Sequence, residues 1–244
     1  RQHGSIGQKT FGIMRRLLPK EITCLMLEGT MLSRPPGGTL ITEDDVYEEM
    51  SRHIHANKGK LVLCSLSASN VTRMVQLFRA AKREGRLLIL DAFVAAILEV
   101  CTPFAVLPQR GWTDDVRILY LGGHAKLVGD AFGDWDLVAK LKYANNRITL
   151  EDMAKDPGRY VLPFRQGLIR HLAEQPSMLK GAAHIYSLWH GYREQPNYKP
   201  VKQFFDSHGI NDIPDVHVSG HAYVEDLVTA QVAAQSGRLP ESDW

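Results

Sequence analysis

The stretch Lys60-Leu61-Val62-Leu63-Cys64-Ser65-Leu66-Ser67-Ala68-Ser69-Asn70 changes from apolar residues to small polar residues near its middle. Its first half predicts a buried β-strand, and its second half predicts a turn into a helix from Val71 to Glu84. The run Arg86-Leu87-Leu88-Ile89-Leu90 predicts a second buried strand, followed by a helix to about Val100. Apolar strands that alternate with helices are typical of a parallel sheet covered on both faces, so the sequence predicts an α/β fold.

The same alternation continues on both sides of this segment. Further strands are predicted at 22–27, 116–121, 159–164 and 182–186, and further helices at 42–55, 122–146 with breaks near Gly129 and Gly133, 149–155, 166–174 and 198–208. No internal repeat or heptad run accompanies them.

Composition limits the classes of function. The chain has 244 residues, 44% of them hydrophobic, and a formal net charge of +2, so nucleic acid would bind in a local groove and not on a strongly basic surface. The apolar surroundings of Cys24, Cys64 and Cys101 predict buried, reduced thiols. No apolar run reaches membrane-spanning length and no signal peptide is present, which predicts a soluble cytoplasmic protein without membrane contact. The polar start at Arg1 instead of a methionine suggests a fragment.

Chemically active residue types are most concentrated between Pro214 and Leu227. Val216 and Val218 suggest the end of a strand, and a helical pattern begins at Ala222. The turn Ser219-Gly220-His221 would therefore present backbone N–H groups, a hydroxyl and an imidazole at a helix start, a combination that suits a phosphate. The alternative is a glycine turn whose histidines serve packing, and both interpretations stay open at this point.

Other candidate residues also have two interpretations. Glu28 lies at the end of a predicted strand, where α/β proteins place site residues, but it could equally be a surface acid. The small polar residues from Ser67 to Asn70 could hold a phosphate, although capping of the next helix is favoured. The aromatic residues Tyr186, Trp189 and Tyr192 could stack on bases, but burial in the core is favoured.

Four sequence blocks carry a resemblance. They are Leu25-Met26-Leu27-Glu28-Gly29-Thr30, Ser67-Ala68-Ser69-Asn70, Tyr186-Ser187-Leu188-Trp189-His190-Gly191-Tyr192 and His217-Val218-Ser219-Gly220-His221-Ala222. In this order, with an α/β segment between them, they resemble the β-CASP branch of the metallo-β-lactamase-fold hydrolases, which includes ribonuclease J and the polyadenylation-site endonucleases. The resemblance covers nearly the whole chain and thins after Leu227.

The resemblance implies a division of the chain. Residues 41–210 would form a β-CASP domain, a parallel-rich sheet flanked by helices, inserted into a metallo-β-lactamase core that carries two zinc ions. Residues 1–40 and 211–244 would be incomplete parts of that core.

The resemblance also assigns site residues. His221 matches a histidine that protonates the leaving oxygen, and Glu28 matches the acid that holds it. His217 and Ser219, with Gly220 beside them, match a pocket for a nucleotide phosphate. Weaker matches for the channel wall are Ser67, Asn70 and Ser187.

The metal motifs of the family have no counterpart. The HxHxDH cluster is absent, and its nearest approach, His53-Ile54-His55, lacks the acid. The tail from Gln235 to Pro240 holds no histidine that could stand for the family's third motif. Because the family places HxHxDH upstream of the acid, we expect this chain to begin after that cluster, to contribute no metal ligand that can be assigned, and to be inactive alone.

The resemblance thus predicts part of a zinc-dependent phosphodiesterase, a nuclease for which RNA is favoured over DNA. The alternative is a catalytically inactive module that binds nucleic acid or a partner protein. A weaker third hypothesis, an unrelated nucleotide-binding domain, lacks the GxGxxG and P-loop motifs. Assembly into a homodimer is left open.

Overall fold

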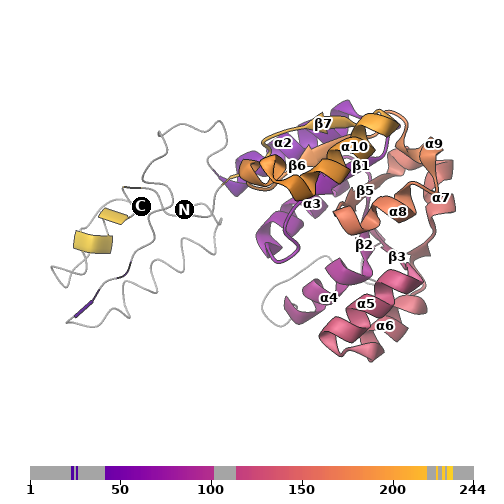
Figure 1. Cartoon of the computed structure of the whole chain (residues 1–244), viewed down its shortest axis with the longest axis horizontal. Coiled ribbons are helices and arrows are strands. Elements are labelled where there is room, and N and C mark those ends of the chain that lie inside the picture. Colours follow the sequence, from indigo (N-terminus) through magenta and orange to yellow (C-terminus); the bar gives the residue numbers. More distant parts are fainter. Residues whose placement is uncertain are drawn as a thin grey trace. The chain divides into compact units, whose positions relative to one another are not determined.

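The computed structural model describes residues 23, 24, 26, 42–101, 114–218, 224, 227, 228 and 230–232. The chain divides into two units, Asp44–His217 and the remaining residues. The architecture below is that of the unit Asp44–His217 (Figure 1). The assignment of both terminal segments to a metallo-β-lactamase core falls largely outside the described residues and stays a prediction.

Seven strands form one sheet in the order β4-β3-β2-β5-β1-β6-β7, and every neighbouring pair is parallel. The strands are β1 (Val62–Ser65), β2 (Leu87–Asp91), β3 (Val116–Leu119), β4 (Arg147–Ile148), β5 (Tyr160–Pro163), β6 (Ala183–Tyr186) and β7 (Asn211–Ile213). The predicted α/β fold with a parallel sheet flanked by helices is therefore confirmed.

The helices alternate with these strands. They are α2 (Glu43–Ala56), α3 (Val71–Arg83), α4 (Ala92–Cys101), α5 (Gly122–Phe132), α6 (Trp135–Lys142), α7 (Leu150–Lys155), α8 (Ile169–Leu172), α9 (Pro176–Leu179) and α10 (Lys199–His208), with 3₁₀ turns η2 (Pro157–Arg159), η3 (Gln166–Leu168), η4 (His190–Glu194) and η5 (Pro196–Tyr198). Within the described residues, every helix is too short or too polar to cross a bilayer.

The strand order decides which face each helix covers. The connections after β1, β2 and β3 move toward the β4 edge, and those after β4, β5 and β6 move toward the β7 edge. Because crossovers between parallel strands are right-handed, α3 to α6 cover one face and α7 to α10 cover the other. Figure 1 shows α4, α5 and α6 as one group, in agreement with their mutual contacts.

The central strand β1 is buried on both faces. Leu63 is level with Leu162 of β5 and with His184 of β6, and these side chains share one face. On that face Leu63 and Leu162 join a core with the aromatic residues of α10, Phe204 and Phe205. Burial on both faces explains why these strands are apolar along their length.

The sheet has topological switch points beside β1. The helix after β1 lies on one face, whereas the connections after its neighbours β5 and β6 lie on the other, and β2 and β5 diverge in the same way. In open α/β sheets, ligands bind in crevices at the carboxyl ends of strands that diverge like this. The order of the strands therefore directs the search for a site to the ends of β1, β2, β5 and β6.

Several local expectations differ from the structure. Cys24 and Met26, expected in a buried strand, are exposed and lie outside any strand, whereas the prediction that Cys64 is buried is confirmed. The strand end expected at Val216 and Val218 is wrong, because the strand is β7, just before them. Both valines are buried all the same, and the Val216 N–H donates to the carbonyl of Tyr186 at 3.0 Å, so their apolar character reflects packing just beyond the end of β7.

The segment from 122 to 146 contains α5 and α6, and the edge strand β4 follows it. The helix continues through Gly129 and breaks only at Gly133, which adopts the left-handed conformation with φ 68°. A Cβ at Gly129 would lie 3.1 Å from the Trp135 ring, so the glycine allows α6 to pack closely on α5.

Candidate functional site

A buried arginine joins the segments that follow the ends of β1 and β6. Arg73 lies in the first turn of α3 and is only 1% exposed. Its Nη1 donates to the hydroxyl of Ser187 at 2.7 Å and to the carbonyl of the same residue at 3.3 Å, and it lies 3.1 Å from Nδ1 of His217. The cluster thus joins three segments that follow β1, β6 and β7; we call Arg73, Ser187 and His217 the Arg73 cluster.

The start of α3 fixes the position of Arg73. Asn70 is the N-cap of the helix, and its side-chain oxygen accepts from the Arg73 backbone N–H at 3.0 Å. Capping is the function favoured for this residue from the sequence, and it is confirmed. Ser67 is exposed and its hydroxyl pairs with that of Ser69 at 2.8 Å, within the same turn.

The hydrogen bonds of the Arg73 cluster define proton positions. A guanidinium only donates, so Nδ1 of His217 accepts and a neutral imidazole carries its proton on Nε2. The Ser187 hydroxyl accepts from Arg73 and donates to the carbonyl of Val216. Ser187 is 2% exposed, and it positions Arg73 and the segment that leads into His217.

A second polar cluster lies at the carboxyl ends of β2 and β5. Asp91 is 1% exposed; one carboxylate oxygen caps α4 through the Val94 N–H, and the other accepts from Nη2 of Arg165 at 2.7 Å. The same Nη2 lies 3.3 Å from Nε2 of His124, and the Arg165 guanidinium lies over the Phe93 ring. Burial lowers the pKa of His124, which favours the neutral ring that this contact requires.

Two donors of the second cluster have no acceptor among the described residues. They are Nη1 of Arg165 and Nδ1 of His124, which carries the ring proton because Nε2 faces the arginine. Both atoms are shielded from solvent, so this cluster serves to join α4, α5 and β5 and does not form an open site.

A buried polar chain runs through the sheet on the α10 face. His184 has no exposed surface; its Nε2 lies 2.8 Å from the Ser65 hydroxyl and its Nδ1 lies 2.8 Å from Asp212. Asp212 also pairs with Arg193 of η4. Burial lowers the pKa of His184 although Asp212 opposes the shift.

The buried polar chain of Ser65, His184 and Asp212 has the hydrogen-bonding order of a serine–histidine–aspartate triad. Ser65, however, is a strand residue with 6% exposure, and the imidazole lies under the aromatic rings of Phe164 and Phe205. A substrate carbonyl has no route to the hydroxyl, so the arrangement is structural.

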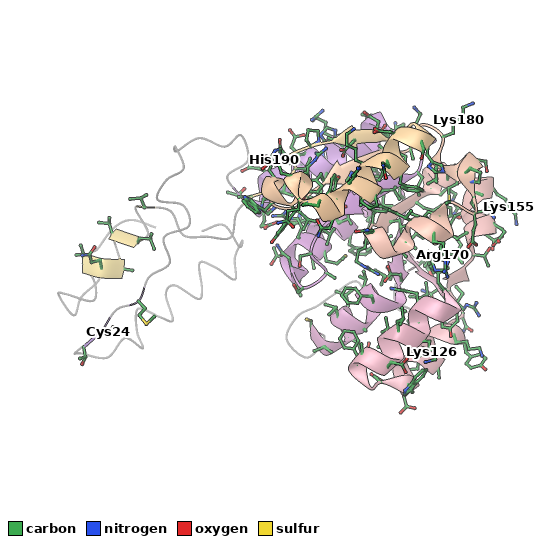
Figure 2. All side chains as sticks on the ribbon, viewed as in Figure 1. Cys24, Lys126, Lys155, Arg170, Lys180 and His190 are labelled. Atoms are coloured by element: carbon green, nitrogen blue, oxygen red, sulfur yellow. The ribbon has the colours of Figure 1, made fainter. Side chains whose placement is uncertain are left out.

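The aromatic block after β6 separates into core and surface. Tyr186 is 1% exposed, and burial raises its pKa to about 12. Trp189 and Tyr192 are 45% and 48% exposed, and their rings meet edge to face at a centroid distance of 5.3 Å. Figure 2 shows His190, which lies between them in sequence, at the opposite end of the unit from Lys155 and Lys180. Those two lysines precede β5 and β6, so His190 marks the carboxyl edge of the sheet.

The structure tests only part of the predicted site. Glu28, Ser219, Gly220 and His221 lie outside the described residues, so their roles stay predictions. Of the others, Asn70, Ser187 and His217 lie around Arg73, and Ser67 lies in the turn before them. Within the part of the chain that the structure describes, no group of three or more His, Cys, Asp or Glu side chains could hold a metal ion.

Sequence reasoning missed Arg73, the residue that contacts the predicted ones. A basic residue in a predicted helix is usually solvated, and its partners lie 114 and 144 residues further along the chain. One signal was available: Arg73 follows the N-cap Asn70 by three residues, in the turn after a central strand, where side chains point into the crevice.

Comparisons with known proteins show the fold alone. No protein-family model matches the chain, and no curated protein does. Among solved structures, the chain is similar to a protein of unknown function from Enterococcus faecalis V583, with a TM-score of 0.61 and 18% sequence identity. The similarity covers 98% of this chain and 49% of that protein, so the chain spans about half of its length.

Proposed function

We propose that this chain is the substrate-binding, β-CASP-type part of a metal-dependent phosphodiesterase, a nuclease that acts on RNA. Two kinds of observation support the proposal. One is the ordered set of sequence blocks that resemble the β-CASP hydrolases. The other is the Arg73 cluster, which brings Ser187 and His217 together at the carboxyl edge of a parallel sheet.

The Arg73 cluster is the observation that carries the proposal. Arg73 supplies a permanent positive charge, since a guanidinium does not lose its proton in proteins. It also holds His217 by Nδ1 in the tautomer whose Nε2–H donates to phosphate oxygens. A cation that orients an imidazole at a switch point suits a phosphodiester: Arg73 is buried and acts through His217, which is only partly buried and would make the contact with the phosphate.

The described residues do not fit a zinc pair, because they offer no set of three metal-binding side chains. The function proposed for this part of the chain is therefore binding and positioning of the substrate phosphate. Glu28 and His221 keep the roles that the resemblance implies, protonation of the leaving oxygen by His221 and its orientation by Glu28.

The test uses the protein encoded by the complete reading frame. We expect about two zinc ions per chain by metal analysis, cleavage of single-stranded RNA, and loss of that cleavage in His221→Ala with the fold retained. His55→Ala, which changes an exposed histidine on α2, is the control and should cleave normally. A complete protein that contains no zinc and cleaves no phosphodiester would reject the hydrolase and leave the binding module.

Binding is tested separately. His217→Ala should weaken the binding of single-stranded RNA by about 10- to 150-fold, the equivalent of one hydrogen bond to a charged group. Strand binding that is unchanged in His217→Ala would show that the phosphate does not lie at the Arg73 cluster.

A further inference from the structure

Two exposed aromatic side chains closely follow Ser187 of the Arg73 cluster along the chain. Trp189 and Tyr192 have rings almost perpendicular to each other, with an interplanar angle of 88°. About half of each side chain is open to solvent. We call this pair the aromatic platform.

The backbone under the platform is shaped for the indole ring. A Cβ added at Gly191 would lie 2.3 to 2.6 Å from three ring carbons of Trp189, closer than any side chain could be tolerated. The ring therefore lies directly against the backbone of Gly191, and only glycine permits that approach. The position of an exposed tryptophan is thus fixed from one side by the main chain.

The segment that carries the platform is anchored at both ends. The Tyr186 hydroxyl donates to the Trp189 carbonyl at 3.1 Å, and Nδ1 of His190 lies 3.1 Å from Asp215. At the far end, Arg193 pairs with Asp212 of the buried polar chain, and its guanidinium lies over the Tyr186 ring. Exposed aromatic side chains gain nothing in stability from such anchoring, but a pre-organised surface loses less entropy when it binds.

The platform is also close to the Arg73 cluster along the chain. Ser187 of the cluster precedes Trp189 by two residues, a span of at most roughly 7 Å between Cα atoms. Asp215, which pairs with His190, precedes His217 by two residues. A phosphate at the cluster and a base on the platform would therefore belong to the same nucleotide or to neighbouring ones.

We propose that the aromatic platform stacks the unpaired bases of a single-stranded nucleic acid whose phosphate lies at the Arg73 cluster. This inference rests on the proposed function and specifies its substrate as single-stranded and bound largely without regard to base identity. Stacking is sequence-tolerant because every base presents a flat π-face. In a duplex those faces are covered by stacking on the neighbouring base pairs, so the platform favours a single strand over a double strand.

The charges around the platform favour a base over a phosphate. The carboxylates of Glu194 and Asp215 flank His190 at 3.7 and 3.1 Å and would repel a phosphate placed directly on the rings. The apolar surface consists of two side chains, which suits one or two planar rings. A protein partner needs about 800 Å² on each side of a stable interface, far more than this pair provides.

The test compares strands with and without bases. The probes are an end-labelled oligoriboadenylate of about ten nucleotides and an abasic ribose-phosphate strand of the same length, titrated with the full chain in the presence of a chelator. We expect Trp189→Leu to weaken the base-bearing strand by about 5- to 150-fold and to leave the abasic strand unchanged. Tyr192→Leu should have the same selectivity.

A matched control is available on α6. Trp135 is 49% exposed, close to the value for Trp189, and begins α6, which precedes the edge strand β4 at the end of the sheet opposite to β6 and β7. Trp135→Leu should leave both strands unaffected, and circular dichroism should confirm that all variants are folded.

The outcomes separate this inference from the proposed function. Equal loss of both strands in Trp189→Leu, or no loss of either, would overturn the platform while phosphate binding at Arg73 stands. Base-dependent binding through Trp189 in a complete protein that cleaves nothing would keep the platform and reject the hydrolase. If Trp189→Leu changes only the sedimentation of the chain, the pair is a protein contact and the inference is wrong.

Discussion

Gly191→Ala is the change that separates the geometry of the aromatic platform from the stability of the fold. The new Cβ would lie 2.3 Å from a ring carbon of Trp189, and an ordinary carbon–carbon contact is roughly 3.5 Å. The indole must therefore swing outward by more than about 1 Å. Because the obstructed group is an exposed side chain, the ring moves and the backbone does not.

The energetic cost is small. The displaced ring loses its edge-to-face contact with Tyr192, which contributes roughly 0.5–1.5 kcal/mol. The alanine restricts the unfolded chain and offsets about 0.4–1 kcal/mol of that loss. The free energy of unfolding should thus change by less than about 1 kcal/mol.

Binding should change much more than stability. We expect oligoriboadenylate to bind at least about 5-fold more weakly, because the displaced ring no longer stacks in register with Tyr192. Urea unfolding followed by circular dichroism gives the stability, and anisotropy of the labelled strand gives the affinity. If the alanine variant binds the base-bearing strand like the wild type, the platform is not pre-organised by Gly191 and the argument fails.

Two further predictions concern the fold itself. Gly158→Ala should destabilise the protein by about 1–3 kcal/mol in urea unfolding, because its Cβ would lie 2.5 Å from the Cα of Gly59, a backbone atom that cannot move aside. The control is Gly167→Ala, whose Cβ meets no atom within 4 Å and which should be neutral or slightly stabilising. Equal stabilities of the two variants would refute the contact between Gly158 and Gly59. Burial lowers the pKa of His184, so below about pH 6.5 the unfolded chain binds a proton at this residue that the folded chain does not. The free energy of unfolding should therefore fall by up to about 1.4 kcal/mol per pH unit as the pH drops below that value. His184→Gln should flatten this pH profile, and an unchanged slope would assign the effect to another residue.

The centre of the sheet was predictable because it is buried on both faces. Apolar runs such as the one before Ser65 have no polar alternation, and only a central parallel strand needs that pattern. The edge strands were missed for the converse reason. β4 has two residues and β7 reads Asn211-Asp212-Ile213, so neither carries an apolar run. Their pairing comes from the neighbouring strand and leaves no signal in their own sequence.

The candidate site shows the same limit at the level of side chains. Ser187 and His217 could be selected by residue type, whereas Arg73 has the sequence context of a solvated charge. Only the fold brings it to its partners, which follow β6 and β7. The sequence could not separate buried from exposed aromatic residues after β6, because the alternation of a strand ends where the strand ends. Tyr186, the last residue of β6, still follows the strand and is buried, whereas Trp189 follows a turn that no pattern describes.

The buried polar chain explains how η4, a surface segment, can be held as firmly as the strands of the sheet. Buried ionic groups are often no more stabilising than apolar residues of the same volume, so stability alone does not account for Asp212 between His184 and Arg193. Hydrogen bonds have direction, which apolar contacts lack. Through them Arg193 of η4 is tied to His184 in β6 and, beyond it, to Ser65 in the central strand. Because the Arg73 cluster is attached to the ends of the same two strands, the phosphate contact and the stacking surface that we propose would keep a fixed spacing, which a single strand with a regular backbone requires.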